Sequence, residues 1–124
     1  MSKVLIIDDD PTNIFALKAV LKAKGWDTLS AYSAADGMKL LSKDESIGIV
    51  LLDMMMPDID GYEMIGQLRA DEHFKKLPVI AVTAQAMKGD REKCLEAGAS
   101  DYVSKPIDID RLYVLLQNYL NRKP

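Results

Sequence analysis

Three short runs of apolar residues divide the chain, and between them apolar residues recur every three or four positions. The runs span Val4–Ile7, Ile49–Leu52 and Val79–Val82. Continuous runs that are rich in β-branched residues are typical of strands buried on both faces of a sheet. The stretches Thr28–Tyr32 and Tyr102–Val103 are more polar or shorter. We expect both to be strands, the first of them at an edge of the sheet.

A helix is predicted after each strand, because apolar residues recur there at helical spacing. Pro11 favours the start of the first helix, and Gly25 favours its end. Asp108 is expected to cap the last helix, since its side chain can accept hydrogen bonds from the unpaired amides of the first turn. The helices are expected after Pro11, around Met38–Leu41, and at Gly61–Ala70, Lys88–Ala97 and Ile109–Leu120.

Strands that alternate with helices predict an α/β fold, in which a parallel sheet carries helices on both faces. Right-handed crossovers leave few topologies, and the Rossmann and flavodoxin-like strand orders are the two commonest. A length of 124 residues, of which 48% are hydrophobic and 28% charged, suits one globular domain over residues 1–124. In either strand order, functional groups collect just beyond the carboxyl ends of the strands.

The composition excludes several classes of function. Sixteen Lys and Arg against nineteen Asp and Glu give a net charge of −3, and the basic residues are too scattered for a nucleic-acid surface. No apolar run reaches the roughly 20 residues of a membrane span, and the start of the chain carries no signal-peptide pattern. We therefore expect a cytoplasmic protein without membrane contact. The single cysteine, Cys94, excludes an internal disulfide, and the single histidine, His73, excludes mechanisms that need two.

Polar side chains stand where the apolar strands end. Asp8–Asp10 follow the first run, and Asp53 follows Ile49–Leu52. Thr83 follows the next strand, and Lys105 comes just after the last one. Carboxylates that converge from two strands repel each other unless a cation lies between them, and an all-oxygen site suits Mg²⁺. A lysine and a hydroxyl beside such an ion are the groups that a phosphoryl group needs.

Each of these residues also has a purely structural explanation. Asp8–Asp10 could favour a helix N-terminus, Asp53 could lie in a turn, Thr83 could cap a helix, and Lys105 could simply be solvated. Together, however, they stand at the ends of four strands, which four unrelated caps would not require. Met54–Met56 are interpreted as loop covering and core filler. Cys94 is expected to be inert, because its helix offers no His or acidic pair that would activate the thiol. His73 is expected to be exposed, because it lies in a polar segment between a helix and a strand.

At this point the chain resembles a known family, the receiver domains of bacterial response regulators and hybrid histidine kinases. The resemblance covers essentially the whole chain and rests on four motifs with matching spacing. These motifs are Val-Leu-Ile-Ile-Asp-Asp-Asp, Leu-Leu-Asp-Met-Met-Met-Pro-Asp-Ile-Asp-Gly, Val-Ile-Ala-Val-Thr-Ala and Asp-Tyr-Val-Ser-Lys-Pro. The family has the flavodoxin-like (βα)5 fold with strand order 2-1-3-4-5, so the resemblance selects between the two topologies.

The resemblance implies an acceptor and a metal site. Asp53 corresponds to the phosphoacceptor. Asp8 and Asp9 correspond to the acidic pair that holds Mg²⁺, for which Mn²⁺ is a substitute, with Asp9 the more direct ligand and Asp8 acting more through water. The backbone carbonyl of Met55 would complete the protein ligands, together with Asp53. No role follows from the resemblance for Asp10.

The resemblance also implies a switch. Thr83 corresponds to the hydroxyl that binds a phosphoryl oxygen, and Lys105 to the cation that pairs with another. Tyr102 matches the aromatic residue that moves when Thr83 does, and the Lys105–Pro106 peptide bond is expected to be cis. The residues two past the acceptor and two past the switch hydroxyl, Met55 and Gln85, influence hydrolysis in this family. Neither can act as a charged base, and Ala84 beside the switch is small, so we expect the phosphoryl state to last minutes or longer.

Function and partners follow from the same resemblance. A receiver domain takes its phosphoryl group from a histidine kinase or a histidine phosphotransfer protein, and it is a self-modifying switch in a two-component phosphorelay rather than a turnover enzyme. We expect no DNA-binding module after the last helix. The domain either stands alone or belongs to a hybrid sensor kinase, and a weak homodimer is compatible with either arrangement.

A phosphohydrolase of the haloacid-dehalogenase type is the main alternative. Asp8, Asp10 and Thr12 fit its Asp-x-Asp-x-Thr motif, with Asp8 as the nucleophile. Only three residues separate Asp10 from Ile14, which leaves no room for a substrate-covering insertion, and Asp53 would have no role. A flavin or nucleotide carrier would need a phosphate-binding loop after the first strand, where this chain has carboxylates. A receiver that only docks partners would not need so complete a site.

Overall fold

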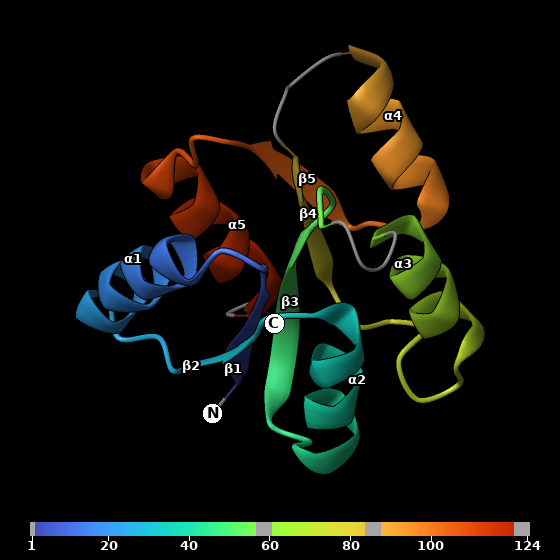
Figure 1. Cartoon of the computed structure of the whole chain (residues 1–124), viewed down its shortest axis with the longest axis horizontal. Helices are drawn as coiled ribbons and strands as arrows, with labels where there is room; N and C mark the ends of the chain where they lie inside the picture. Colours follow the sequence, from blue (N-terminus) through green and yellow to red (C-terminus); the bar gives the residue numbers. More distant parts are fainter. Residues whose placement is uncertain (1, 57–60, 84–87, 121–124) are drawn as a thin grey trace.

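The computed structural model describes residues 2–56, 61–83 and 88–120 of the chain. Within these ranges, five strands alternate with five helices (Figure 1). The strands are β1 (Lys3–Ile7), β2 (Thr28–Ala31), β3 (Ile47–Asp53), β4 (Val79–Thr83) and β5 (Asp101–Ser104). The helices are α1 (Pro11–Ala23), α2 (Ala34–Lys43), α3 (Gly61–Ala70), α4 (Lys88–Ala97) and α5 (Ile109–Leu120).

The strands form one parallel sheet in the order β2-β1-β3-β4-β5. This is the flavodoxin-like order, and the expected α/β fold is confirmed. β2 lies at an edge of the sheet, as its polar sequence predicted. Ile7 pairs with Leu52, and Asp53 pairs with Val82, so the carboxyl ends of β1, β3 and β4 lie next to one another.

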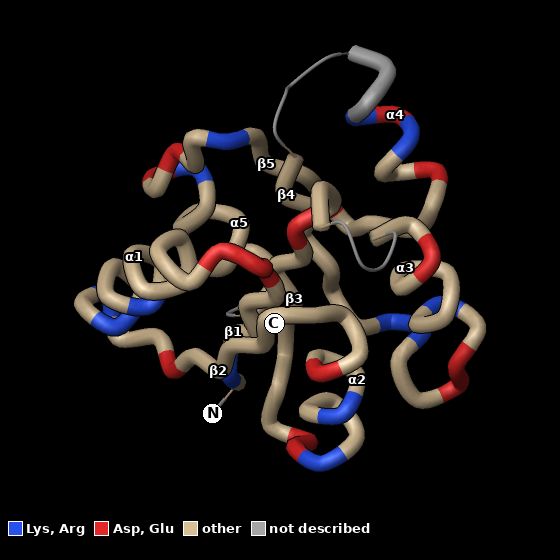
Figure 2. The backbone as a smooth tube through the Cα atoms, in the orientation of Figure 1, with Lys and Arg blue, Asp and Glu red and all other residues tan. Residues whose placement is uncertain are grey.

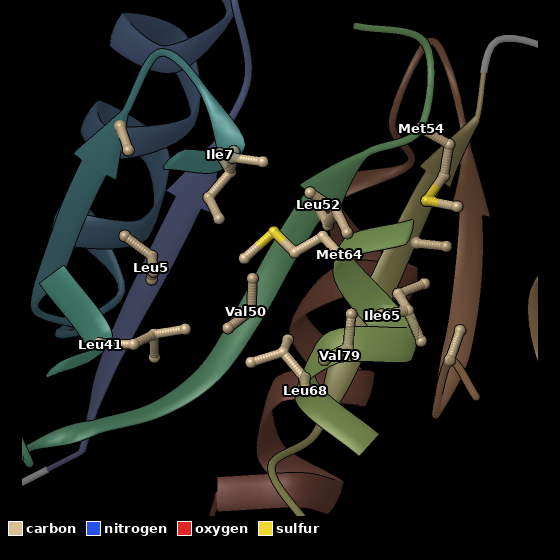
Figure 3. Close-up of a cluster of buried hydrophobic side chains, with 14 of the residues drawn as sticks. Leu5, Ile7, Leu41, Val50, Leu52, Met54, Met64, Ile65, Leu68 and Val79 are labelled. Carbon is tan, nitrogen blue, oxygen red and sulfur yellow. The ribbon is translucent and has the colours of Figure 1, made fainter. Parts of the chain in front are cut away.

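Helices cover both faces of the sheet, and each face has its own apolar core. Helices α1 and α5 lie on one face, and α2, α3 and α4 lie on the other (Figure 1). On the second face, Met64, Ile65 and Leu68 of α3 pack against residues of β3 and β4, including Val50 and Val79 (Figure 3). Burying each of these large side chains contributes on the order of 1.5–3 kcal/mol. The central strands are thereby held rigidly, and with them the residues at their ends.

Polar caps define where several helices begin. The Asp10 side chain accepts a hydrogen bond of 3.0 Å from the Thr12 amide at the start of α1. At the start of α5, Asp108 accepts hydrogen bonds from the amides of Asp110 and Arg111, at 3.0 and 3.3 Å, which confirms the predicted cap. Gly25, after α1, has a φ of +90°, a conformation that favours glycine.

The strand boundaries differ from the prediction in small ways. β2 ends at Ala31, so the predicted strand to Tyr32 was one residue too long; Tyr32 lies in the following bend with 55% of its surface exposed. β3 and β5 extend beyond their apolar runs, to Asp53 and to Ser104. The reason is that ladder hydrogen bonds continue past the last apolar side chain, which periodicity alone does not reveal. The predicted bounds of α3, α4 and α5 are confirmed.

The surface carries charges of both signs. Basic and acidic segments alternate along most of the backbone, without one basic face in this view (Figure 2). Of the large exposed apolar side chains in the described ranges, Phe15, Leu95 and Val114 lie on three different helices, and Tyr32 and Met55 lie outside the helices. None of the helices in those ranges is both long and apolar enough to cross a membrane.

Candidate functional site

The carboxyl edge of the sheet gathers buried polar side chains. Asp8 directly follows β1, Asp53 is the last residue of β3, and Thr83 is the last residue of β4. Only 3%, 3% and 4% of their respective surfaces are exposed. Buried polar groups are costly unless they have partners, so three of them at neighbouring strand ends indicate a functional site rather than a packing element.

Three carboxylates lie close together at this edge. One oxygen from each of Asp8, Asp9 and Asp53 lies within 4.8 Å of the others, and acidic stretches mark the passage from β1 to α1 and the nearby end of β3 (Figure 2). Asp9 is exposed, whereas the other two are buried. An all-oxygen set of this kind, open on one side, fits a hard ion such as Mg²⁺ or Mn²⁺, which keeps part of its water shell.

Lys105 connects two of these carboxylates. Its Nζ lies 3.3 Å from Asp53 Oδ2 and 3.5 Å from Asp8 Oδ2. The backbone amide of Lys105 donates a hydrogen bond of 2.7 Å to the Thr83 carbonyl, and the Lys105–Pro106 peptide bond is cis, as expected. The lysine is therefore held between the two acidic groups by a backbone that is tied to the end of β4.

Burial and neighbouring groups set the protonation of the site. Burial alone would raise the pKa of Asp8, but hydrogen bonds from the Asp10 amide and from Asn13, and the charge of Lys105, outweigh it, and the pKa is lowered. At Asp53, burial and the charge of Asp8 outweigh the backbone amide and the lysine that stabilise its charge, so the pKa is raised. Burial alone would lower the pKa of Lys105, but the two carboxylates outweigh it and raise the pKa. The site thus holds more negative charge than its lysine balances, which favours a bound cation.

The loop between β1 and α1 holds Asp8 by both of its oxygens. Oδ1 accepts a hydrogen bond of 2.9 Å from the Asp10 amide, and Oδ2 accepts one from Asn13 Nδ2. The sequence analysis did not identify Asn13. The one feature that could have indicated its contact with Asp8 is that an amide residue lies in the first turn of the helix after the aspartates. Asp10, which had no assigned role, is the N-cap of α1. Both oxygens of Asp8 are thus held by donors from its own loop and from the first turn of α1.

Met55 lies beside Asp53 with its side chain in solvent. Its amide donates a hydrogen bond of 2.9 Å to Asp53 Oδ1, and 61% of the residue is exposed. Met54 and Met56 on either side are buried in the core, so the interpretation as core filler is confirmed for these two residues. The use of the Met55 carbonyl as a metal ligand stays a prediction.

The predicted switch residues occupy adjacent strands. Thr83 of β4 pairs with Ser104 of β5, and Tyr102 of β5 pairs with Ala81. The Tyr102 ring is half-buried, and the guanidinium carbon atoms of Arg91 and Arg111 each lie 5.8 Å from its centroid. The coupling of Tyr102 to Thr83 stays a prediction.

The other residues that the sequence analysis named either lie outside the described residues or lie away from the acidic cluster. Ala84 and Gln85, which were expected to influence hydrolysis, lie outside the described residues. Cys94 is fully buried on α4, with the Tyr62 hydroxyl 3.8 Å from its Sγ. His73 is exposed, as expected, and its ring packs edge-on against Phe74. In this arrangement neither the thiol nor the imidazole belongs to the acidic cluster.

Comparison with known proteins gives one consistent family. The family model of the response regulator receiver domain matches residues 4–117. The polar-differentiation response regulator DivK of Brucella ovis is 33% identical over 117 residues, which are 94% of each chain.

Solved structures agree with the family match. The receiver domain of the Francisella response regulator 1452 superposes with a TM-score of 0.89 at 28% identity, covering 98% of both chains. The receiver domain of the sensor histidine kinase PA1611 of Pseudomonas aeruginosa has a TM-score of 0.86 at 31% identity, covering 97% of this chain and 98% of that one. That structure is described as having a magnesium ion coordinated in its active-site cleft.

Proposed function

This chain belongs to the response regulator receiver domain family of two-component signalling, and from that premise we propose that Asp53 takes a phosphoryl group from the phosphohistidine of a partner protein. The observation that carries the proposal is the position of Asp53: it is buried at the end of β3, 3.3 Å from the lysine ammonium and within reach of two further carboxylates. Residues 1–124 act as one receiver domain in this proposal.

The chemistry is an in-line displacement at phosphorus. A carboxylate oxygen of Asp53 forms the new bond to phosphorus, the bond from phosphorus to the imidazole nitrogen breaks, and its electron pair leaves with the imidazole. Lys105 offsets the charge of the transferred group, and the Thr83 hydroxyl donates to one of its oxygens. When bound, Mg²⁺ reduces the repulsion between the carboxylate and the phosphate; Asp9, Asp53 and the Met55 carbonyl would hold it directly, and Asp8 through water.

The product acts as a switch. By analogy with phosphorylated hydroxyl residues, the aspartyl phosphate carries about −1.5 to −2 charges, in place of the single charge of Asp53. This charge draws Thr83 and Lys105 toward it, and Tyr102 on the neighbouring strand follows the threonine. A partner then senses the rearranged chain after β4. The domain helps to modify itself and does not turn over a separate metabolite.

The donor in this proposal is a histidine kinase or a histidine phosphotransfer protein. Support comes from the relatives, which include a response regulator and the receiver domain of a sensor histidine kinase. The proposal also includes a cytoplasmic location, because a lone buried thiol such as Cys94 suits a reducing compartment. We propose no contact with nucleic acid or membrane, in keeping with the interspersed surface charges. A weak homodimer is compatible with the proposal.

Stoichiometry separates a phosphoacceptor from a phosphohydrolase. The protein is incubated with excess acetyl phosphate and Mg²⁺, and both the intact mass and the released phosphate are followed. We expect up to one phosphoryl group per chain and only slow release of phosphate. Many equivalents of phosphate per chain, lost in Asp8→Asn but kept in Asp53→Asn, would instead support the hydrolase.

A further inference from the structure

Asn13 makes a contact that neither the helix nor the core requires. It lies half-buried in the first turn of α1, and its Nδ2 donates to Asp8 Oδ2. Because an ionised carboxylate only accepts hydrogen bonds, the NH₂ end of the amide has to face Asp8. The N-terminus of α1 is already capped by Asp10, and asparagine inside a helix is less favourable than alanine. The helix therefore gains nothing from an amide at this position.

The same Asp8 oxygen is also within reach of the lysine of the site. Lys105 Nζ lies 3.5 Å from Asp8 Oδ2 and 3.3 Å from Asp53 Oδ2, so two carboxylates share one ammonium group. Asn13 supplies Asp8 Oδ2 with a neutral donor at the point where it would otherwise depend on the lysine. Oδ1 is held separately by the Asp10 amide.

We propose that Asn13 is a positioning residue, which fixes the Asp8 carboxylate for cation binding and leaves Lys105 to Asp53. The inference rests on the proposed function, since it assigns Asp8 to the Mg²⁺ site. Without the amide, the buried carboxylate turns toward the ammonium as its remaining side-chain donor. Asp8 then forms a closer ion pair with Lys105, so its charge is neutralised by the lysine and no longer attracts a cation. The same movement draws Lys105 away from Asp53. Both effects weaken the cation site.

The residues that hold a metal ligand in place typically change metal affinity by 10- to 100-fold when they are removed. Because Asp8 is expected to act mainly through water, we expect the lower end of that range. The dissociation constant for Mg²⁺ should rise about tenfold in Asn13→Ala. Alanine favours the helix, so the variant is expected to fold at least as well as the parent chain.

The test is a Mg²⁺ titration of the whole protein, followed by backbone NMR shifts and without a phosphoryl donor. Thr12→Ala is the matched control, because Thr12 is the exposed neighbour in the same helical turn, and its affinity should equal that of the parent. A double-mutant cycle with Asp8→Asn then separates positioning from a general structural effect. If Asn13 acts through Asp8, Asn13→Ala should change the affinity of the Asp8→Asn protein less than twofold.

Two results would overturn the role of Asn13 while leaving the proposed function intact: an unchanged affinity in Asn13→Ala, or an equal loss with and without Asp8→Asn. A failure of the proposed function looks different. In that case the parent protein would not bind Mg²⁺, or Asp9→Ala would bind it as tightly as the parent, and the inference would fall with it.

Discussion

Asp53 is a buried carboxylate, and its ionised form is disfavoured in the folded chain. Burial and the charge of Asp8 raise its pKa, so the folded state binds a proton more readily than the unfolded state. At neutral pH the ionised group therefore costs stability, and this cost disappears as the pH falls below the unfolded value near 3.8. Residues at functional sites often carry such a cost.

Asp53→Asn is expected to raise the free energy of unfolding at pH 7, in the absence of Mg²⁺, by about 1 kcal/mol. The lysine keeps a partner, because Asp8 Oδ2 lies 3.5 Å from Lys105 Nζ. Urea unfolding at several pH values measures the difference, which should shrink toward pH 3 and on addition of Mg²⁺. A variant less stable than the parent at pH 7 would show that the charge of Asp53 is not a burden on the fold.

The lifetime of the phosphoryl group is a second property that we expect single residues to set. Met55 is exposed beside Asp53 and is apolar, so it cannot orient an attacking water, and Gln85 cannot act as a charged base. We expect the phosphorylated protein to decay over minutes or longer. Replacing both residues, as Met55→Asn with Gln85→Glu, should accelerate the decay. Decay within seconds in the parent protein, or no acceleration in the double variant, would mean that these side chains do not control hydrolysis.

At the level of the elements, the Asp44 carboxylate connects the start of β1, the end of α2 and the start of β3. Asp44, which follows α2, accepts hydrogen bonds from the amide and hydroxyl of Ser46, and its Oδ2 lies 3.0 Å from Lys3 Nζ. The hydrogen bonds from Ser46 and Lys3, with the charge of Lys3, lower its pKa to about 2. A lowered pKa means that the charged form stabilises the fold above pH 4, and that this contribution is lost as the pH falls from about 4 to about 2.

Asp44→Asn should therefore be less stable than the parent at pH 7, and the two proteins should converge near pH 2. Thermal unfolding across this range measures the difference. Glu45→Gln is the control, because Glu45 is the exposed neighbour and should show no such convergence. If the Asp44→Asn difference were constant from pH 7 to pH 2, the contribution of Asp44 would not come from its charge.

The elements also show which parts of the structure can be predicted from sequence. The apolar runs predicted the central strands because β1, β3 and β4 are buried on both faces. The order of the strands did not follow from the pattern, since any parallel order would give the same runs, and it came from the resemblance. Tyr32 was misplaced because the end of an edge strand is set by its ladder partner, which periodicity does not reveal.

The candidate site was predictable to a similar degree. Asp8, Asp53 and Thr83 could be identified because strand ends in a parallel sheet converge by topology. The contact from Asn13 to Asp8, and the sharing of Lys105 between two carboxylates, could not be foreseen. Both depend on side-chain directions that arise only when α1 and the segment after β5 pack against the sheet.

For the whole molecule, a rigid sheet carries a charged site at one edge. The two apolar cores hold β1, β3 and β4 in register, so the aspartates are placed before any cation or phosphoryl group arrives. Electrostatic groups that need no rearrangement at the moment of reaction are the most effective ones. Phosphorylation at Asp53 is therefore the event on which the proposed switch depends.

Phosphorylation at this position is tested most directly by locating the modified residue. The protein is treated with acetyl phosphate and Mg²⁺, and borohydride then reduces the acyl phosphate, which converts the modified aspartate to homoserine. Peptide mass spectrometry identifies the position. We expect homoserine at residue 53 alone, and none in Asp53→Asn. Homoserine at residue 8, or a modified aspartate that persists in Asp53→Asn, would contradict the account.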